Sequence, residues 1–306
     1  MGFLSGNIAC TRFNIISLPD EPAFQQQSFQ LIQPGSNFTE SSGFIPFEIE
    51  EPYTLGKNFH AFRVRIDKIN IDATLLKERL RELIKLERDR GEKLGSKKIR
   101  NLKRLAQDEL LSRSAPRSKV IEGVIRNQVL YVGSTSKSHL GTVLALLQKI
   151  GVEVEYKTPW FDLGMEENEH PWLDLKEPGQ SIFGSRFLRA LFEEHDFMVE
   201  PEKGSIKLAT PTHARVSLTG EVLGELDHYL EEGAEILAAK LIFEETPMAF
   251  DGLSYRINSI KLERFKGDHW SEVLELRLDR LQEVWEAFDT RFSQLKTKLQ
   301  VQAAIT

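Results

Sequence analysis

Cysteine is almost absent from this sequence, since Cys10 is the only one among 306 residues. A single cysteine cannot form a disulfide within the chain, and it excludes a metal site built from several thiolates. Long apolar runs are also missing, because no stretch approaches the roughly 18 residues needed to cross a bilayer. The opening residues MGFLSGNIACTRFNI lack the basic and apolar regions of a secretory signal. We therefore expect no membrane partner and a reducing, cytoplasmic compartment.

Familiar catalytic motifs are missing as well. The sequence has no GxxxxGK[ST], no GxGxxG and no HExxH, and its seven histidines are scattered. The run from Glu166 to His170 could hold a hard cation, although a solvated acidic loop is the commoner reason for such a run. Glu193 and Glu194 are adjacent on an expected helix, so their side chains diverge. We predict no enzyme activity, no cofactor and no metal, with a metal-dependent nuclease as the least favoured alternative.

Positive charge is scarce overall but concentrated in one segment. The chain has 40 Lys and Arg against 46 Asp and Glu, a formal net charge of -6. Between Lys77 and Arg126 there are 16 basic and 8 acidic residues, so this segment carries +8 and the remainder -14. Such asymmetry is typical of one surface built for a polyanion, although a long solvated helix of mixed charge is the alternative. Few aromatic residues lie in this segment, which favours contact with a duplex backbone over base stacking.

Helical and strand patterns alternate without a regular βαβ order, which predicts an α+β fold with mixed antiparallel sheets, long charged helices and a long C-terminal amphipathic helix. Phe59 to Asp67 alternates as a strand with a basic outer face. Asp72 is an expected N-cap, Ser96 caps a second helix, and Ser217 to Glu221 resembles a capped helix start. The expected parts are 1–72 (β-rich), 73–119 (basic helical pair), 120–180 (β-hairpin, helix, strand and acidic loop) and 181–306 (α+β, ending in the long helix).

The last expected helix carries a regular apolar seam. Its members recur at steps of four and three residues: Leu274, Leu278, Leu281, Trp285, Phe288, Phe292 and Leu295. An ordinary amphipathic core helix has this pattern, and so does an intermolecular coiled coil. The second interpretation makes Leu274, Leu278 and Leu281 dimer contacts. It would also allow a protein-interaction scaffold that does not bind DNA.

The order of these segments resembles the RdgC family of recombination-associated proteins. The resemblance rests on an ordered set of segments, each weak by itself: Gly43-Phe44-Ile45-Pro46, the charged helix pair at 71–113, the hairpin and helix at 120–151, the region 217–245, and Phe288-Asp289 with Phe292. Together they span most of the chain.

This resemblance implies a ring- or horseshoe-forming subunit. It implies a homodimer that closes around duplex DNA, binds it with little sequence preference, is associated with the nucleoid, antagonises RecA-dependent recombination and catalyses no reaction. The basic positions that we expect at the DNA are Lys97, Lys98, Arg100, Lys103, Arg104, Arg113, Arg117, Lys119 and Arg215.

Two departures from the family pattern concern these contacts. The family has an aromatic residue in a ring-closing contact where this chain has Ala115, within Ser112-Arg113-Ser114-Ala115. This places one dimer contact, and with it a closed ring, in question. The family's pair of lysines before a Leu-Thr sequence is reduced here to Arg215, because Ala214 precedes it.

Overall fold

The computed structural model describes residues 2–33, 38–165, 170–199 and 204–304. Its strands are β1 (Asn7–Ser17), β2 (Glu40–Ile45), β3 (Thr54–Gly56), β4 (Phe59–Lys68), β5 (Arg117–Arg126), β6 (Val129–Val132), β7 (Glu153–Tyr156), β8 (Phe197–Val199), β9 (Ser205–Ala209), β10 (Arg215–Thr219), β11 (Glu235–Phe243), β12 (Thr246–Asp251) and β13 (Arg256–Lys261). Its α-helices are α1 (Ala73–Asp89), α2 (Ser96–Leu111), α3 (Lys137–Lys149), α4 (Pro159–Asp162), α5 (Ile182–Glu193), α6 (Leu226–Glu231) and α7 (Trp270–Ala304).

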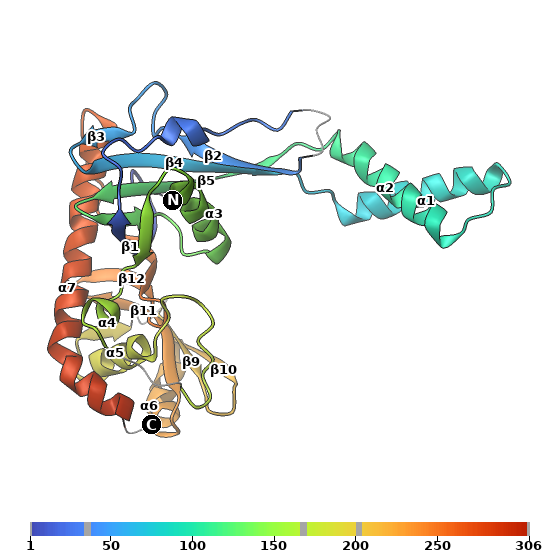
Figure 1. Ribbon diagram of the computed structural model, residues 1–306. Helices are drawn as coiled ribbons and strands as arrows, with labels where there is room; N and C mark the ends of the chain where they lie inside the picture. The colour runs from blue at the N-terminus through green and yellow to red at the C-terminus, as the bar shows by residue number, and fades with distance from the viewer. Residues whose placement is uncertain (1, 34–37, 166–169, 200–203, 305–306) are drawn as a thin grey trace.

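The strands form a large antiparallel sheet, which confirms the predicted α+β class. Their order is β10-β9-β11-β12-β13-β1-β6-β5-β4-β2, with β3, β7 and β8 beside this path. β1 belongs to both halves, because its residues 7–10 pair with β13 and its residues 11–14 pair with β6. We call the β10 to β13 half the lower sheet and the β6 to β2 half the upper sheet, as they appear in Figure 1.

The sheet has two main apolar cores, and the larger one includes residues of both halves. The upper sheet packs Phe62, Val64 and Ile125 against Leu140 and Leu147 of α3. In the lower sheet the apolar side chains of β11 and β12 pack against α5 and α7. Figure 1 shows α7 running along one side of both halves, so this helix connects them mechanically.

The apolar seam of α7 lies inside this core, which corrects the predicted dimer contact. Leu274, Leu278 and Leu281 are 0% exposed within the single chain. Their side chains have no surface left for a second molecule, because they lie in one buried cluster with residues of both sheets. The interpretation as an amphipathic core helix is therefore correct, and an intermolecular coiled coil through these leucines is wrong.

Several local predictions also need correction. Ser217 to Thr219 lies in β10, and a 3-10 helix follows only from Gly220. Ser96 is the first residue of α2, and Gly95 occupies the N-cap position. The stretch 34–52 is rich in proline, glycine and serine, and no strand was predicted there, yet it contains β2, which pairs with β4 from Glu40 to Ile45. β2 is defined by its pairing with β4 and β10 by its hairpin with β9, so the composition of each strand alone does not reveal it.

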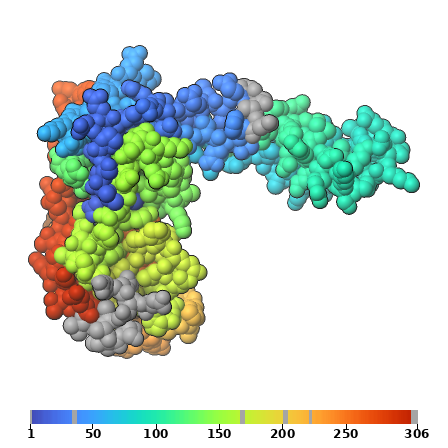
Figure 2. Space-filling view, viewed as in Figure 1, coloured from blue at the N-terminus to red at the C-terminus, as the bar shows by residue number. Residues whose placement is uncertain are grey.

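The four expected parts do not correspond to separate sheets. β4 and β5 pair along their whole length, from Phe59 opposite Arg126 to Lys68 opposite Arg117. This pairing joins the parts 1–72 and 120–180 in one sheet, and it takes Arg117 and Lys119 out of the helical pair and into β5. Figure 2 shows the resulting L-shaped outline, with α1 and α2 standing clear of the body.

Candidate nucleic-acid interface

The basic segment forms a helical hairpin, here called the arm (residues 73–111), that leaves the upper sheet between β4 and β5 (Figure 1). α1 begins where predicted, because the Asp72 carboxylate accepts hydrogen bonds from the backbone N–H groups of Thr74 at 2.7 Å and Leu75 at 3.1 Å. The hydrogen bonds from Leu75 and Thr74 lower the pKa of Asp72. The carboxylate therefore stays charged at the helix start, where it satisfies free N–H groups.

A small apolar line holds the two helices of the arm together. Leu83, Leu102 and Ala106 are buried there, and partly buried leucines and Ile84 surround them. An assembly only two helices thick covers the facing sides alone, so the outer sides of both helices stay in solvent. The arm therefore has a large charged surface for its size.

Ion pairs join α1 to α2 at the edges of this line. The Arg79 guanidinium lies 2.6 Å from Glu109, and the Lys98 ammonium lies 2.5 Å from Glu87 and also pairs with Glu92. The hydrogen bond from Lys98 lowers the pKa of Glu87, and that from Arg79 lowers the pKa of Glu109. Lys98, one of the predicted DNA contacts, is thus already engaged by two carboxylates.

The outer side of α2 carries a stripe of free cations. Lys97, Arg100 and Arg104 are exposed and are spaced by three and four residues, which places them on one helix face. Leu102 and Ala106 mark the opposite, buried face. None of these three cations has an ion pair among the described residues. Lys103 is also exposed, toward the side of this stripe.

The outer side of α1 carries a second stripe, which the sequence-based list of DNA contacts omitted. Lys77, Arg81, Lys85 and Arg88 are exposed at steps of four, four and three residues. Within the described chain none of them forms an ion pair. The helical period was visible in the sequence, but only the position of buried Leu83 shows that these residues face outward.

The root of the arm is basic as well. Arg113, Arg117 and Lys119 are exposed, and β4 places Lys68 directly opposite Arg117. Burial, and then the positive charges of Lys119 and Lys68, lower the pKa of His139 on the neighbouring α3. Ala115 is exposed in the segment between α2 and β5.

Arg215 lies apart from the arm, on the lower sheet. It is exposed on edge strand β10, and Ser217 on the same face is paired with Lys207 of β9. Lys240 of β11 and Lys261 of β13 are exposed on the face that the α5 and α7 core does not cover. The sequence-based list missed all three lysines. Each lysine alternates with apolar residues in its strand, and this alternation was the signal in the sequence that could have placed it on the outer face.

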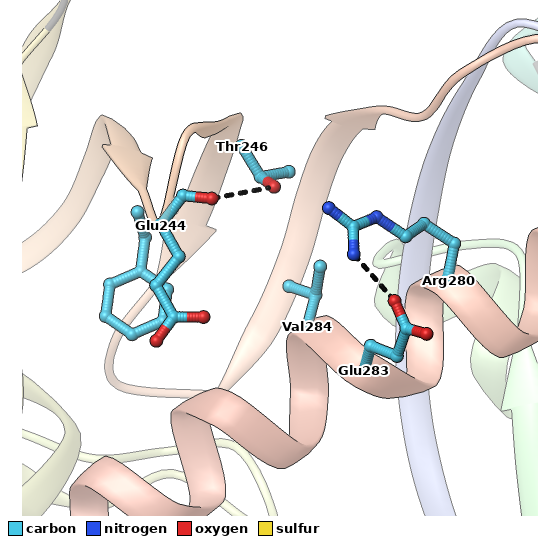
Figure 3. Close-up of a pocket in the computed structure, with 6 residues that line it drawn as sticks. Glu244, Thr246, Arg280, Glu283 and Val284 are labelled. Carbon is cyan, nitrogen blue, oxygen red and sulfur yellow. Dashed lines mark hydrogen bonds and ion pairs between the residues drawn. The ribbon is translucent and has the colours of Figure 1, made fainter.

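Two other cavities in the described chain are less suited to bind a polyanion, because their lining includes carboxylates. A cavity of about 760 Å³ beside Phe24, Tyr53 and His60 has Asp20 and Glu21 among its lining residues. Figure 3 shows a smaller one of about 50 Å³ between the β11–β12 turn and α7. There Arg280 pairs with Glu283 at 2.6 Å, so its charge is already compensated.

The described residues contain neither a cluster of metal ligands nor a membrane-spanning helix. No cluster of three or more His, Cys, Asp or Glu side chains that could hold a metal ion occurs in them. Residues 166–169 of the acidic run lie outside the described part. In the part of the chain that is described, no helix is long and apolar enough to cross a membrane.

No protein-family model matches the chain, and a search of curated proteins also found no match.

Proposed function

We propose that this chain binds duplex DNA through its phosphate backbone without reading the base sequence. The observation that carries the proposal is the pair of outward stripes on the arm, whose cations lack carboxylate partners in the described chain although the protein is acidic overall. Backbone phosphates require only cations placed along a surface, with no pattern matched to base edges. The protein would therefore act by covering the DNA and would not catalyse a reaction on it.

Two features favour a duplex over a single strand. The arm contains no aromatic residue between Ala73 and Leu111, so it offers no platform for base stacking. The stripe from Lys77 to Arg88 extends about 16 Å along its helix, at roughly 1.5 Å per residue. A duplex presents a phosphate about every 1.7 Å along its axis, so a stripe of this length meets several phosphates.

The wider proposal follows the RdgC resemblance. The protein would act as a homodimer in a ring or horseshoe around the DNA, associated with the nucleoid, and would deny the duplex to RecA. The L-shaped outline in Figure 2 is compatible with this proposal, because a second copy facing the inner angle would enclose a space. Lys97, Arg100, Lys103, Arg104, Arg113, Arg117, Lys119 and Arg215 remain proposed contacts, whereas Lys98 is more strongly tied to the arm itself.

The test reverses the charge of the α2 stripe. Lys97→Glu, Arg100→Glu and Arg104→Glu together should abolish binding to unrelated duplexes at low salt, while far-ultraviolet circular dichroism stays unchanged. Binding by the unaltered protein should weaken steeply with salt, because each neutralised phosphate contributes roughly 0.9 to the slope of log K against log salt. Inhibition of RecA strand exchange should be lost in the same variant.

The matched control reverses three exposed lysines away from the arm, Lys57, Lys149 and Lys266. This control changes the net charge equally and should keep most of the affinity. Equal loss in both variants would mean that net charge alone acts, and salt-insensitive binding would contradict the proposal.

A further inference from the structure

The face of the lower sheet that points away from α5 and α7 carries exposed lysines and small side chains, which play no part in the apolar core. On β11, Ala239 and Leu241 point into the core with α5 and α7, so Lys240 points the other way. The strand register aligns Lys240 with Ala249 of β12 and Ala249 with Ser259 of β13. The small side chains of Ala249 and Ser259 therefore leave a flat surface beside the exposed Lys240.

A second row of this face lies two residues along the strands. There Lys261 is paired with Asn7 of β1, whose side-chain amide donates a hydrogen bond to the Ser259 hydroxyl at 3.1 Å. Lys240 and Lys261 are both exposed, and neither has an ion pair or side-chain hydrogen bond among the described residues. Two strand spacings of about 4.8 Å separate β11 from β13, so two flexible lysine side chains can reach one group between them.

Between these lysines the surface is hollowed. The hollow has a volume of about 170 Å³, and its lining consists of Asn7, Lys240, Leu241, Pro247, Met248, Ala249, Ser259 and Lys261. No carboxylate contributes to this lining, although the protein as a whole carries a net charge of -6. The polar side chains present are two ammonium groups, an amide and a hydroxyl, all able to donate hydrogen bonds to an anion.

We infer that this hollow on the lower sheet binds one phosphate group through Lys240 and Lys261, with Asn7 and Ser259 as hydrogen-bond donors. Lysine is a compact charge well suited to phosphate oxygens, and hydroxyl and amide donors satisfy the remaining lone pairs. The volume holds a phosphate with part of a sugar, and it is far too small for a base pair. The group is a phosphate of a bound nucleic-acid strand, in which case the inference rests on the proposed function, or a free phosphorylated molecule.

The experiment follows backbone amide shifts of the full chain by nuclear magnetic resonance. Inorganic phosphate and thymidine 5′-monophosphate are added separately, against sodium chloride at equal ionic strength. We expect saturable shifts at Asn7, Ala249, Ser259 and Lys261 with the phosphate probes only. Lys240→Gln with Lys261→Gln should remove them, Lys240→Arg with Lys261→Arg should retain them, and the control Lys149→Gln with Lys266→Gln should leave them unchanged.

Duplex binding of the same variants identifies the source of the phosphate. If a strand occupies the hollow, the glutamine pair lowers the slope of log K against log salt by roughly 0.9, the value for one phosphate. Saturable shifts with an unchanged slope assign the hollow to a free phosphorylated molecule. Shifts without any duplex binding would keep this inference and reject the proposed function. Absence of saturable shifts, or equal shifts in the glutamine pair, would overturn the inference.

Discussion

At the scale of single residues, one buried ion pair connects the two halves of the molecule. Arg12 lies on β1, which the two sheets share, and donates two hydrogen bonds of 2.8 Å to the Asp289 carboxylate on α7. Its guanidinium also lies 4.0 Å from the centre of the Trp285 ring. Arg12 is only 4% exposed, so the carboxylate and the ring replace the water that it would otherwise contact.

Removing the carboxylate should therefore destabilise the fold. Asp289→Ala leaves the Arg12 charge buried without its partner, and we expect the free energy of unfolding to fall by about 3 kcal/mol. Urea denaturation measures this change. Asp279→Ala is the matched control, because it breaks the more exposed pair with Arg126 and should cost less than about 1 kcal/mol. Equal losses in both variants would contradict the role given to Arg12.

At the scale of elements, helices were predicted better than strands. The N-cap at Asp72, the arm helices and the hairpin of β5 and β6 are confirmed, because capping residues and periodicity are local signals. β2 was missed and β10 was mistaken for a helix start, since their partners β4 and β9 supply what the local sequence lacks. A strand with serine and glycine in it becomes stable only through its neighbours.

The arm should unfold separately from the body when its small core is reduced. Leu102→Ala removes a buried side chain from a cluster that has few others, and the cost of about 2–3 kcal/mol exceeds what so small a core can spare. We expect faster amide hydrogen exchange across residues 73–111 and unchanged exchange in β12.

Leu105→Ala is the control for this prediction, because Leu105 is also in α2 but is 46% exposed. It should leave exchange in the arm nearly unchanged. Faster exchange throughout the body after Leu102→Ala would show that the arm and the sheet unfold together.

At the scale of the whole molecule, positive and negative charge are concentrated in different parts of the fold. The exposed arm and the open face of the lower sheet carry cations without partners in the described chain, whereas the remainder of the sequence is acidic. An acidic body would repel a polyanion and so restrict the proposed DNA to these two surfaces. In the proposed complex, this arrangement would favour ordered contact with a duplex over general electrostatic adhesion.

The proposed homodimer can be tested at the same scale. The chain has a mass of 35.0 kDa, and light scattering should give twice this value in solution. Because Leu274, Leu278 and Leu281 are inside the core, contacts elsewhere must hold two copies together. A monomer at all concentrations would reject the ring and the horseshoe alike, while leaving binding of DNA by the arm as a separate question.

The sequence by itself determined the α+β class, the charged helical hairpin and the segregation of basic residues, because periodicity, capping and composition are local properties. Only the tertiary structure decided which cations are free. Lys97 and Lys98 are adjacent in sequence, yet the fold turns one to solvent and pairs the other with Glu87. It also placed the α7 seam inside the core and brought Lys240 and Lys261 to the same open face of the lower sheet. Those outcomes depend on which distant segments pack together, and no local pattern contains that information.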